Sequence, residues 1–375
     1  MPRAVNTHLA FDVGYAVAAV ILYAFYRKEA PQLGPRRAIA LVFLVFLLSS
    51  FTNEDHSFVV DRSSDYMPTI QNETLQEEMQ EHVVELDPRA VPHSYRFLPN
   101  SIVLWIQLAG VRYDAARDIY RMLAGLLIYY AIYRYARLYA CPTRTTGDPG
   151  LNGPGAPRPV RSPNFLGGIL AMLLTAAVYP ISFEWYMGQL TDPLSHLSFL
   201  LAFIFLETGD FASLLATLII GSLAKETVLA MSGFYVLFCR KQSNYLLKAI
   251  VLCLASLAIY FGVRLFVLHG AMQYQQISGV DTSHVRANWV DIRWHRLFFL
   301  TAGAYLPFLA LGWKSTPASL KRMVLYLIPV LFVSSLVFSW LREARNWMPA
   351  VFVTSVIAGR YLSKLLIDRA ALSEF

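Results

Sequence analysis

The composition of this chain is typical of a membrane protein. It has 375 residues, of which 56% are hydrophobic and only 15% are charged, and its mean hydropathy is +0.45. Soluble domains carry about 25% charged residues, so a single soluble enzyme is excluded, and 14% aromatic residues exclude a disordered chain. The net charge of +7 comes from short basic clusters between apolar blocks. We therefore expect a polytopic membrane protein and no nucleic-acid partner.

Apolar blocks that could form membrane helices follow one another along the chain. A helix needs about 20 apolar residues to cross a bilayer about 30 Å thick. Candidate blocks lie near residues 8–26, 38–51, 115–136, 165–182, 193–206, 247–268, 295–312, 323–341 and 347–364. A further block is interpreted as two half-length segments, 211–223 and 228–239, that turn at Lys225-Glu226. The sequence thus predicts an all-α fold, a polytopic transmembrane helical bundle of about 9–11 membrane segments.

The charge pattern orients these segments. Four basic loops, near 27–37, 137–163, 240–248 and 314–322, are assigned to the cytoplasm by the positive-inside rule. The loop 52–100 has ten acids and three arginines, a net charge of −7. Because one predicted membrane segment, 38–51, separates it from the cytoplasmic loop 27–37, it is placed outside. A turn at 225–226 is needed because one unbroken helix over 211–239 would carry Arg240 to the outer face. We expect the N-terminus outside and the C-terminus inside.

Three parts of the chain follow from this topology. Residues 1–37 form an N-terminal membrane helix and a basic cytoplasmic loop, residues 38–365 the main membrane domain, and residues 366–375 a cytoplasmic tail. Within the main domain, 52–112 comprises the acidic outer loop and an apolar interfacial helix over 97–111. The stretch 137–163, rich in proline and glycine, is predicted to be a linker without a packed core.

Polar and charged residues that could carry chemistry collect on the expected outer face. Charges at a membrane edge are costly and usually functional. They are Asp55, Asp61 and Asp65 in the first loop, Tyr95 and Arg96 before the interfacial helix, Lys225 and Glu226 at the half-segment turn, and Arg342, Glu343 and Arg345 at a late turn. A carboxylate can accept the proton of an attacking hydroxyl, and arginine and lysine can bind a departing phosphate. The combination favours group transfer from a lipid-linked phosphate.

Several local features resemble the GT-C superfamily of polytopic glycosyltransferases, closest to its bacterial members. They are Asp61 with Ser64-Asp65-Tyr66 in an acidic first outer loop, Tyr95-Arg96-Phe97-Leu98-Pro99-Asn100 before an interfacial helix, Lys225-Glu226-Thr227 between two short segments, and Arg342-Glu343-Ala344-Arg345-Asn346-Trp347 at a late charged turn. The resemblance covers residues 38–365, in layout more than in identity. It implies a GT-C-like fold that uses polyprenyl-phosphate sugars.

The resemblance also implies roles for individual residues. In that family an acid of the first loop is the catalytic base, which makes Asp61 or Asp65 the candidate here, with Asp55 next. Lys225, Arg342 and Arg345 become candidates for binding the lipid phosphate, and Tyr95, Arg96, Glu226 and Glu343 further candidates for binding substrate. Structural interpretations stay open beside these: solvated loop acids, a Lys225–Glu226 ion pair, and arginines that pair with Glu343 or reach lipid headgroups.

Cofactor motifs add little. The eight histidines have no metal-ligand spacing, and there is no Walker loop, dinucleotide fingerprint or Gly-x-Ser-x-Gly. We expect no structural metal site. A divalent cation, Mg²⁺ or Mn²⁺, held between the outer acids and a diphosphate stays open.

The expected function is transfer of a sugar from a polyprenyl-phosphate donor to a glycan, lipid or protein acceptor, in assembly of a cell-envelope glycan. The enzyme would be a multi-pass protein of the bacterial inner membrane, with membrane lipid around it and the site on the outer face. One alternative is a transporter or flippase-like permease for an amphiphilic solute, because broken half-segments are common in transporters. Another is a non-catalytic assembly protein with a GT-C-like layout.

Overall fold

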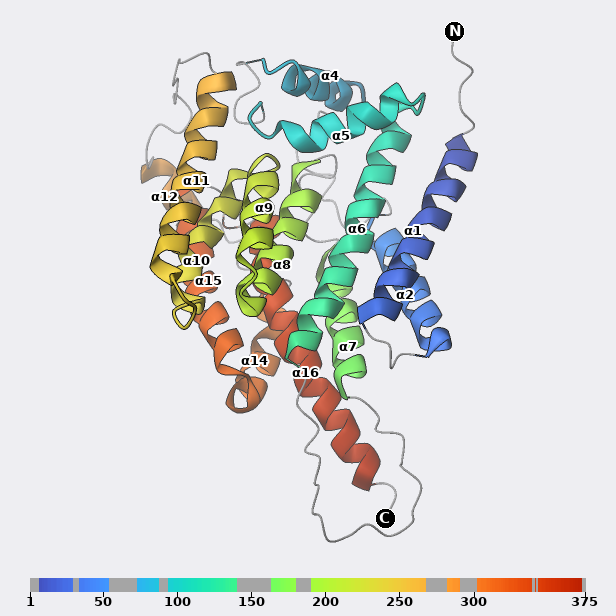
Figure 1. Cartoon of the computed structure of the whole chain (residues 1–375), viewed down its shortest axis with the longest axis vertical. Coiled ribbons are helices and arrows are strands. Elements are labelled where there is room, and N and C mark those ends of the chain that lie inside the picture. Colours follow the sequence, from blue (N-terminus) through green and yellow to red (C-terminus); the bar gives the residue numbers. More distant parts are fainter. Residues whose placement is uncertain are drawn as a thin grey trace.

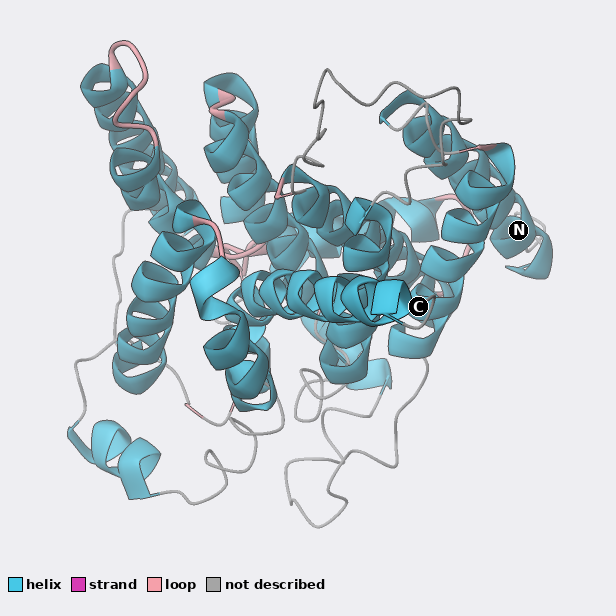
Figure 2. Cartoon of the chain, turned by 90° about the horizontal axis from the view of Figure 1, so that it is seen from below, coloured by secondary structure: helices cyan, strands magenta, loops and turns pink. Residues whose placement is uncertain are grey.

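The described part of the chain is entirely helical. The computed structural model describes residues 7–29, 34–53, 73–87, 94–139, 163–179, 190–267, 282–290, 302–338, 341 and 343–372. Within these ranges, helices are joined by loops and no strand is present (Figure 2). The α-helices are α1 (Thr7–Glu29), α2 (Pro35–Asn53), α4 (Glu73–Val84), α5 (Phe97–Leu108), α6 (Tyr113–Leu138), α7 (Pro163–Val178), α8 (Thr191–Thr208), α9 (Phe211–Ser222), α10 (Met231–Phe238), α11 (Tyr245–Val267), α12 (Thr282–Val290), α14 (Leu306–Gly312), α15 (Ala318–Phe338) and α16 (Met348–Leu372).

Four segments are long and apolar enough to cross a membrane. They are Pro35–Asn53, Tyr245–Phe266, Ala318–Leu336 and Ala344–Ile367. The segment of α11 buries little of its length inside the protein, which leaves side chains such as Leu254 and Phe266 exposed, as expected of a helix that faces lipid. The all-helical fold and the multi-pass character predicted from the sequence are therefore supported. The number of about 9–11 segments stays a prediction.

Helices α7 and α16 pack closely against each other. At Gly359, an added Cβ would lie 2.7 Å from the backbone nitrogen of Ala171 and 2.7 Å from the carbonyl oxygen of Gly167. The two backbones therefore approach as closely as they do in small-residue packing between membrane helices. The long helix α6 lies between α2, α7 and α8 and buries Tyr129 and Tyr133.

The segment from α9 to α10 is broken and folds back on itself. After α9 come the turn at Lys225 and the 3₁₀ helix η3 (Glu226–Ala230), followed by α10. The two ends of the segment lie together, because Gln242 Nε2 donates to the carbonyl oxygen of Gly209 over 3.2 Å. Asp210 caps α9 by accepting the backbone N–H of Ser213 at 3.1 Å. The chain thus reverses at Lys225-Glu226, where the sequence predicts a turn.

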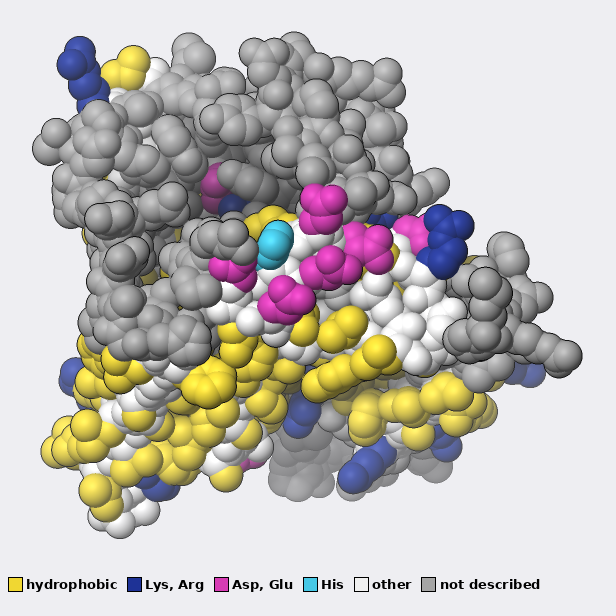
Figure 3. Space-filling model, turned by 90° about the horizontal axis from the view of Figure 1, so that it is seen from above, with side chains coloured by type: hydrophobic (Ala, Val, Ile, Leu, Met, Phe, Trp, Pro, Cys, Tyr) yellow, Lys and Arg dark blue, Asp and Glu magenta, His cyan; other side chains and the backbone are white. Residues whose placement is uncertain are grey.

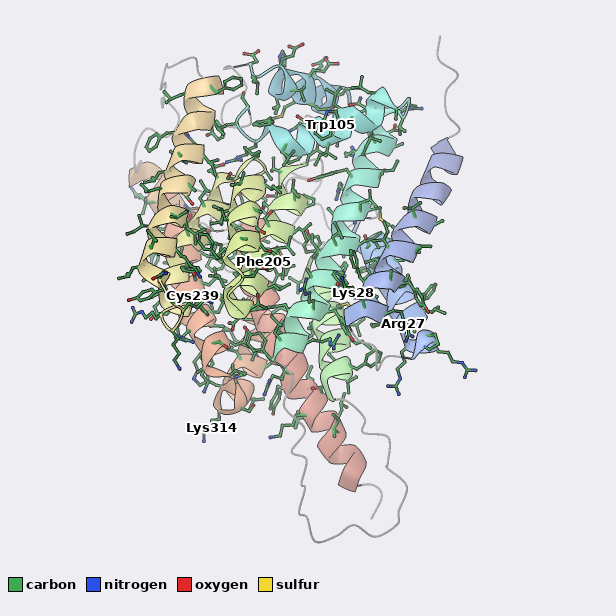
Figure 4. All side chains as sticks on the ribbon, in the orientation of Figure 1. Arg27, Lys28, Trp105, Phe205, Cys239 and Lys314 are labelled. Carbon is green, nitrogen blue, oxygen red and sulfur yellow. The ribbon has the colours of Figure 1, made fainter. Side chains whose placement is uncertain are left out.

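Helices α4 and α5 lie across one end of the bundle, called here the upper end (Figure 1). Trp105 of α5 is at this end and Lys314 is at the opposite one (Figure 4). Helix α5 buries Val103 but leaves Trp105 60% exposed, a distribution that suits an interfacial helix. Acidic side chains gather on the surface seen from above (Figure 3), where Glu78, Glu81 and Glu85 are exposed.

Two predicted boundaries, after residue 112 and after residue 365, lie next to or within described helices. Helix α6 begins at Tyr113, directly after the predicted outer loop and interfacial helix of 52–112. Helix α16 runs on to Leu372, beyond residue 365, where the main membrane domain was expected to end. Most of the predicted linker 137–163 lies outside the described residues.

Candidate functional site

Charged side chains from four separate segments meet below α5. They come from Arg96 before α5, the first turn of α8, the turn between α9 and η3, and the 3₁₀ helix η6 (Ala344–Trp347) with the residue before it. We call them the ion cluster: Arg96, Asp192, Lys225, Glu226, Glu343 and Arg345. Four of these six residues, Asp192, Lys225, Glu343 and Arg345, are less than 10% exposed. The chain therefore buries opposite charges that are far apart in the sequence.

Asp192 stands at the centre of the ion cluster. Its side chain is completely buried, and each carboxylate oxygen has a different cationic partner. Lys225 Nζ donates to Oδ1 at 2.9 Å, and Arg345 Nη1 donates to Oδ2 at 3.1 Å. A carboxylate buried between two cations is stabilised in its ionised form. Asp192 thus fixes how far apart the lysine and the arginine lie.

Glu343 organises the arginine from the other side. Its Oε2 atom accepts from Arg345 Nε at 3.2 Å, from Arg345 Nη2 at 3.0 Å and from Asn346 Nδ2 at 3.0 Å. Asn346 in turn accepts a hydrogen bond from Lys225 Nζ through its Oδ1 atom at 3.3 Å. The guanidinium group of Arg345 therefore lies between two carboxylates, with both of its neighbours held in place.

Arg96 and Glu226 form the part of the ion cluster next to α5. Arg96 Nε donates to Glu226 Oε2 at 3.0 Å and Nη2 donates to Oε1 at 2.7 Å, a bidentate pair. Burial alone would raise the pKa of Glu226, but the charge and hydrogen bonds of Arg96 outweigh it and lower the pKa to about 2. Close to this pair along both segments, the backbone N–H of Leu98 donates to the carbonyl oxygen of Leu223 at 3.2 Å. The interfacial helix is thereby tied to the turn after α9.

A cavity of about 220 Å³ opens beside the ion cluster. One part of its wall is polar and is formed by Arg96, Lys225, Glu226, Glu343, Arg345 and Asn346, together with Ser195, Thr227, Ser334 and Ser335. The other part is apolar and includes Leu327, Val330 and Leu331 of α15 with Met231 and Phe199. Because Val330 is 43% exposed, this apolar wall reaches the outside of the bundle. The cavity is therefore itself amphiphilic.

Two cations of the polar wall keep N–H groups for a ligand. The two hydrogens on Nη1 of Arg96 are not accepted by any described residue. Lys225 uses two of its three ammonium hydrogens, toward Asp192 and Asn346. An anion could bind here without breaking the ion pairs that hold the site together.

Most described candidates from the sequence lie in this one cavity. Arg96, Lys225, Glu226, Glu343 and Arg345 all line it. The alternative interpretation, an ion pair between Lys225 and its neighbour Glu226, is not found: each has a partner from another segment, Asp192 and Arg96 respectively. A short helix that begins with Glu226 points the two side chains apart.

The other candidates are placed differently. Tyr95 is buried beside the cavity rather than in its wall, and its ring lies 4.3 Å from the guanidinium carbon of Arg264. This contact is a cation–π interaction between the segment before α5 and helix α11. Asp55, Asp61, Asp65 and Arg342 lie outside the described residues, so their roles stay predictions.

The sequence places Asp192 in an expected outer turn, 183–192, but assigns it no role and no partner. Its partners stand 33 and 153 positions further along the chain, so no local motif contains them. One signal was present, since a carboxylate lies in the first turn of a mostly apolar helix, and such a charge is costly unless it has a partner. His196, one turn further along α8, was missed for the same reason.

Neither a metal site nor a known relative identifies this cavity. Within the described ranges, no group of three or more His, Cys, Asp or Glu side chains could hold a metal ion. A Mg²⁺ or Mn²⁺ ion held by the acids of the first loop stays untested, because those acids lie outside these ranges. No protein-family model matches the sequence, and comparisons with curated proteins and with solved structures find no match either.

Proposed function

We propose that this protein is a membrane glycosyltransferase of the GT-C type, which transfers a sugar from a polyprenyl-phosphate donor to an acceptor on the outer face. The observation that carries the proposal is the amphiphilic cavity. Its polar wall offers N–H groups of Arg96 and Lys225 to an anion, and its apolar wall on α15 reaches the outside of the bundle. A lipid phosphate matches both walls, because it joins an anionic group to an apolar chain.

The proposed reaction needs one base and one anion site. The acceptor hydroxyl attacks the anomeric carbon, the new glycosidic bond forms, and the bond from that carbon to the phosphate oxygen breaks. The leaving group is polyprenyl phosphate, whose negative charge Lys225, Arg345 and Arg96 stabilise. A carboxylate accepts the proton of the hydroxyl, and Asp61 or Asp65 is the candidate. Asp192 does not suit this task, because both of its oxygens bind cations.

Product analysis tests the proposal. The purified protein in nanodiscs would be given a polyprenyl-phosphate sugar and a mixture of candidate acceptors. We expect free polyprenyl phosphate and a glycosylated product, and we expect the Asp61→Asn, Asp65→Asn double variant to bind donor without turnover. Turnover in that variant at the wild-type rate would remove both assigned bases. Absence of any glycosylated product with every donor and acceptor class would contradict the function.

One observation favours a second candidate, a transporter for an amphiphilic solute. The segment from α9 to α10 is broken and returns to its starting point, and such broken segments bind substrates in transporters. Sealed vesicles that contain the protein separate the two functions. A transporter moves the labelled lipid across the bilayer chemically unchanged, whereas a transferase converts it.

A further inference from the structure

One turn of α8 holds Arg345 at two points. Asp192 and His196 are four positions apart and therefore share a face of the helix. Asp192 accepts a hydrogen bond from the guanidinium group of Arg345 at 3.1 Å. His196 Nε2 lies 3.0 Å from the backbone carbonyl oxygen of the same residue. Side chain and backbone of Arg345 are thus fixed from one rigid helix.

The hydrogen-bond partners define the tautomer of His196. A carbonyl oxygen can only accept, so Nε2 must carry the proton and donate it to Arg345. Nδ1 is then an acceptor, and Tyr179 OH, 3.0 Å away, donates to it. Both side chains are 2% exposed. The rings of Tyr179 and His196 also meet edge to face, with centroids 5.6 Å apart.

The carbonyl that His196 binds lies in the segment that carries three residues of the polar wall. Glu343, Arg345 and Asn346 follow one another around η6, a helix of four residues. A short 3₁₀ helix has few backbone hydrogen bonds of its own. One joins the N–H of Asn346 to the carbonyl oxygen of Glu343 at 3.0 Å, and another joins the N–H of Met348 to the carbonyl oxygen of Arg345, to which His196 adds a second donor. Rotation of the Arg345 peptide would therefore turn Arg345 and Asn346 away from the cavity.

We infer that His196 is a positioning residue for the anion site: its Nε2–H helps to fix the backbone of η6, and the hydroxyl of Tyr179 orients the ring by donating to Nδ1. The identity of the anion as a lipid phosphate rests on the proposed function. The effect of His196 on the phosphate end of a ligand is expected to exceed its effect on the apolar end, because η6 supplies polar wall only.

Two ligands and two substitutions test the inference. Farnesyl phosphate and farnesol share a chain and differ only in the phosphate, and their affinities for the protein in nanodiscs can be compared. His196→Phe should lower the affinity for farnesyl phosphate about tenfold, the usual loss with one buried hydrogen bond. The affinity for farnesol should not change. His196→Gln, whose amide N–H can still donate to the carbonyl, should restore most of the affinity. Equal phosphate affinity of His196→Phe and wild type, or no recovery in His196→Gln, would overturn the inference.

A second measurement judges His196 independently of any ligand. The ¹⁵N shifts of its ring should show a protonated Nε2 and an unprotonated Nδ1, and Tyr179→Phe should change the Nδ1 shift while Nε2 keeps its proton toward the carbonyl oxygen of Arg345. A proton on Nδ1 in the wild type overturns the inference. If the wild type binds no farnesyl phosphate, the proposed function fails, and the tautomer still decides the positioning role.

Discussion

The ammonium group of Lys225 and the carboxylate of Asp192 lie 2.9 Å apart in the interior of the upper end. Lys225 begins the return of a broken segment, and Asp192 begins a helix. Their contact therefore joins two turns of the chain as well as two charges. Because the same carboxylate binds Arg345, Asp192 holds two cations of the cavity wall in place.

Replacement of Asp192 by Asn should destabilise the protein strongly. Asn keeps the shape but removes the carboxylate that binds Lys225 and leaves Arg345 with Glu343, and loss of one partner of a buried ion pair typically costs about 3–5 kcal/mol. Thermal unfolding in detergent would measure the loss. Asp210→Asn is the matched control, since that exposed N-cap tolerates Asn and should stay within about 0.5 kcal/mol. Equal melting temperatures for the two variants would refute a central role for Asp192.

Gly221 should be sensitive to the addition of a single methyl group. Its Cβ would lie 2.7 Å from Cβ of Ser198 and 2.9 Å from Cγ1 of Val228, so α9 would have to move away from α8 and η3. We expect Gly221→Ala to lower stability by about 1–3 kcal/mol and to weaken ligand binding in the neighbouring cavity.

Gly233 provides the control for that substitution. It lies within α10, and no atom stands within 4 Å of the Cβ that alanine would add. Alanine favours a helix by about 0.5–1 kcal/mol over glycine, so Gly233→Ala should be neutral or stabilising in the same unfolding experiment. If both alanine variants behaved alike, the close approach at Gly221 would not be a constraint.

The Arg96–Glu226 pair should contribute a pH-dependent part of the stability. The pKa of Glu226 falls from its ordinary value of 4.5 to about 2 on folding. A group with a depressed pKa stabilises the fold above its unfolded pKa, and this contribution is lost as the pH falls from 4.5 toward 2. Glu226→Gln should remove this dependence and cost about 1–3 kcal/mol at pH 7. If the melting temperatures of the wild type and of Glu226→Gln fell in parallel between pH 5 and pH 3, the result would contradict this role of the pair.

The sequence predicts the helical segments and several charged turns because these signals are local. A Lys-Glu step between two apolar half-segments shows at once that the chain turns at Lys225, and Arg345 is conspicuous between two apolar blocks. The ion-pair partners of these charged residues are not given by local signals. Glu226 binds Arg96, 130 positions earlier, and not its neighbour Lys225. Which acid joins which base depends on how the helices pack, and this is why the partners of Asp192 and His196 are known only from the structure.

The most direct test of the central claim is the affinity of the purified protein for polyprenyl phosphate after removal of a single cavity cation. Lys225→Met removes the ammonium group from the polar wall, and Lys314→Met removes an exposed one at the opposite end. We predict a loss of about tenfold or more for Lys225→Met in protein that remains folded and monodisperse, and no loss for Lys314→Met. Equal affinities in the two variants would show that the lipid phosphate does not bind in this cavity.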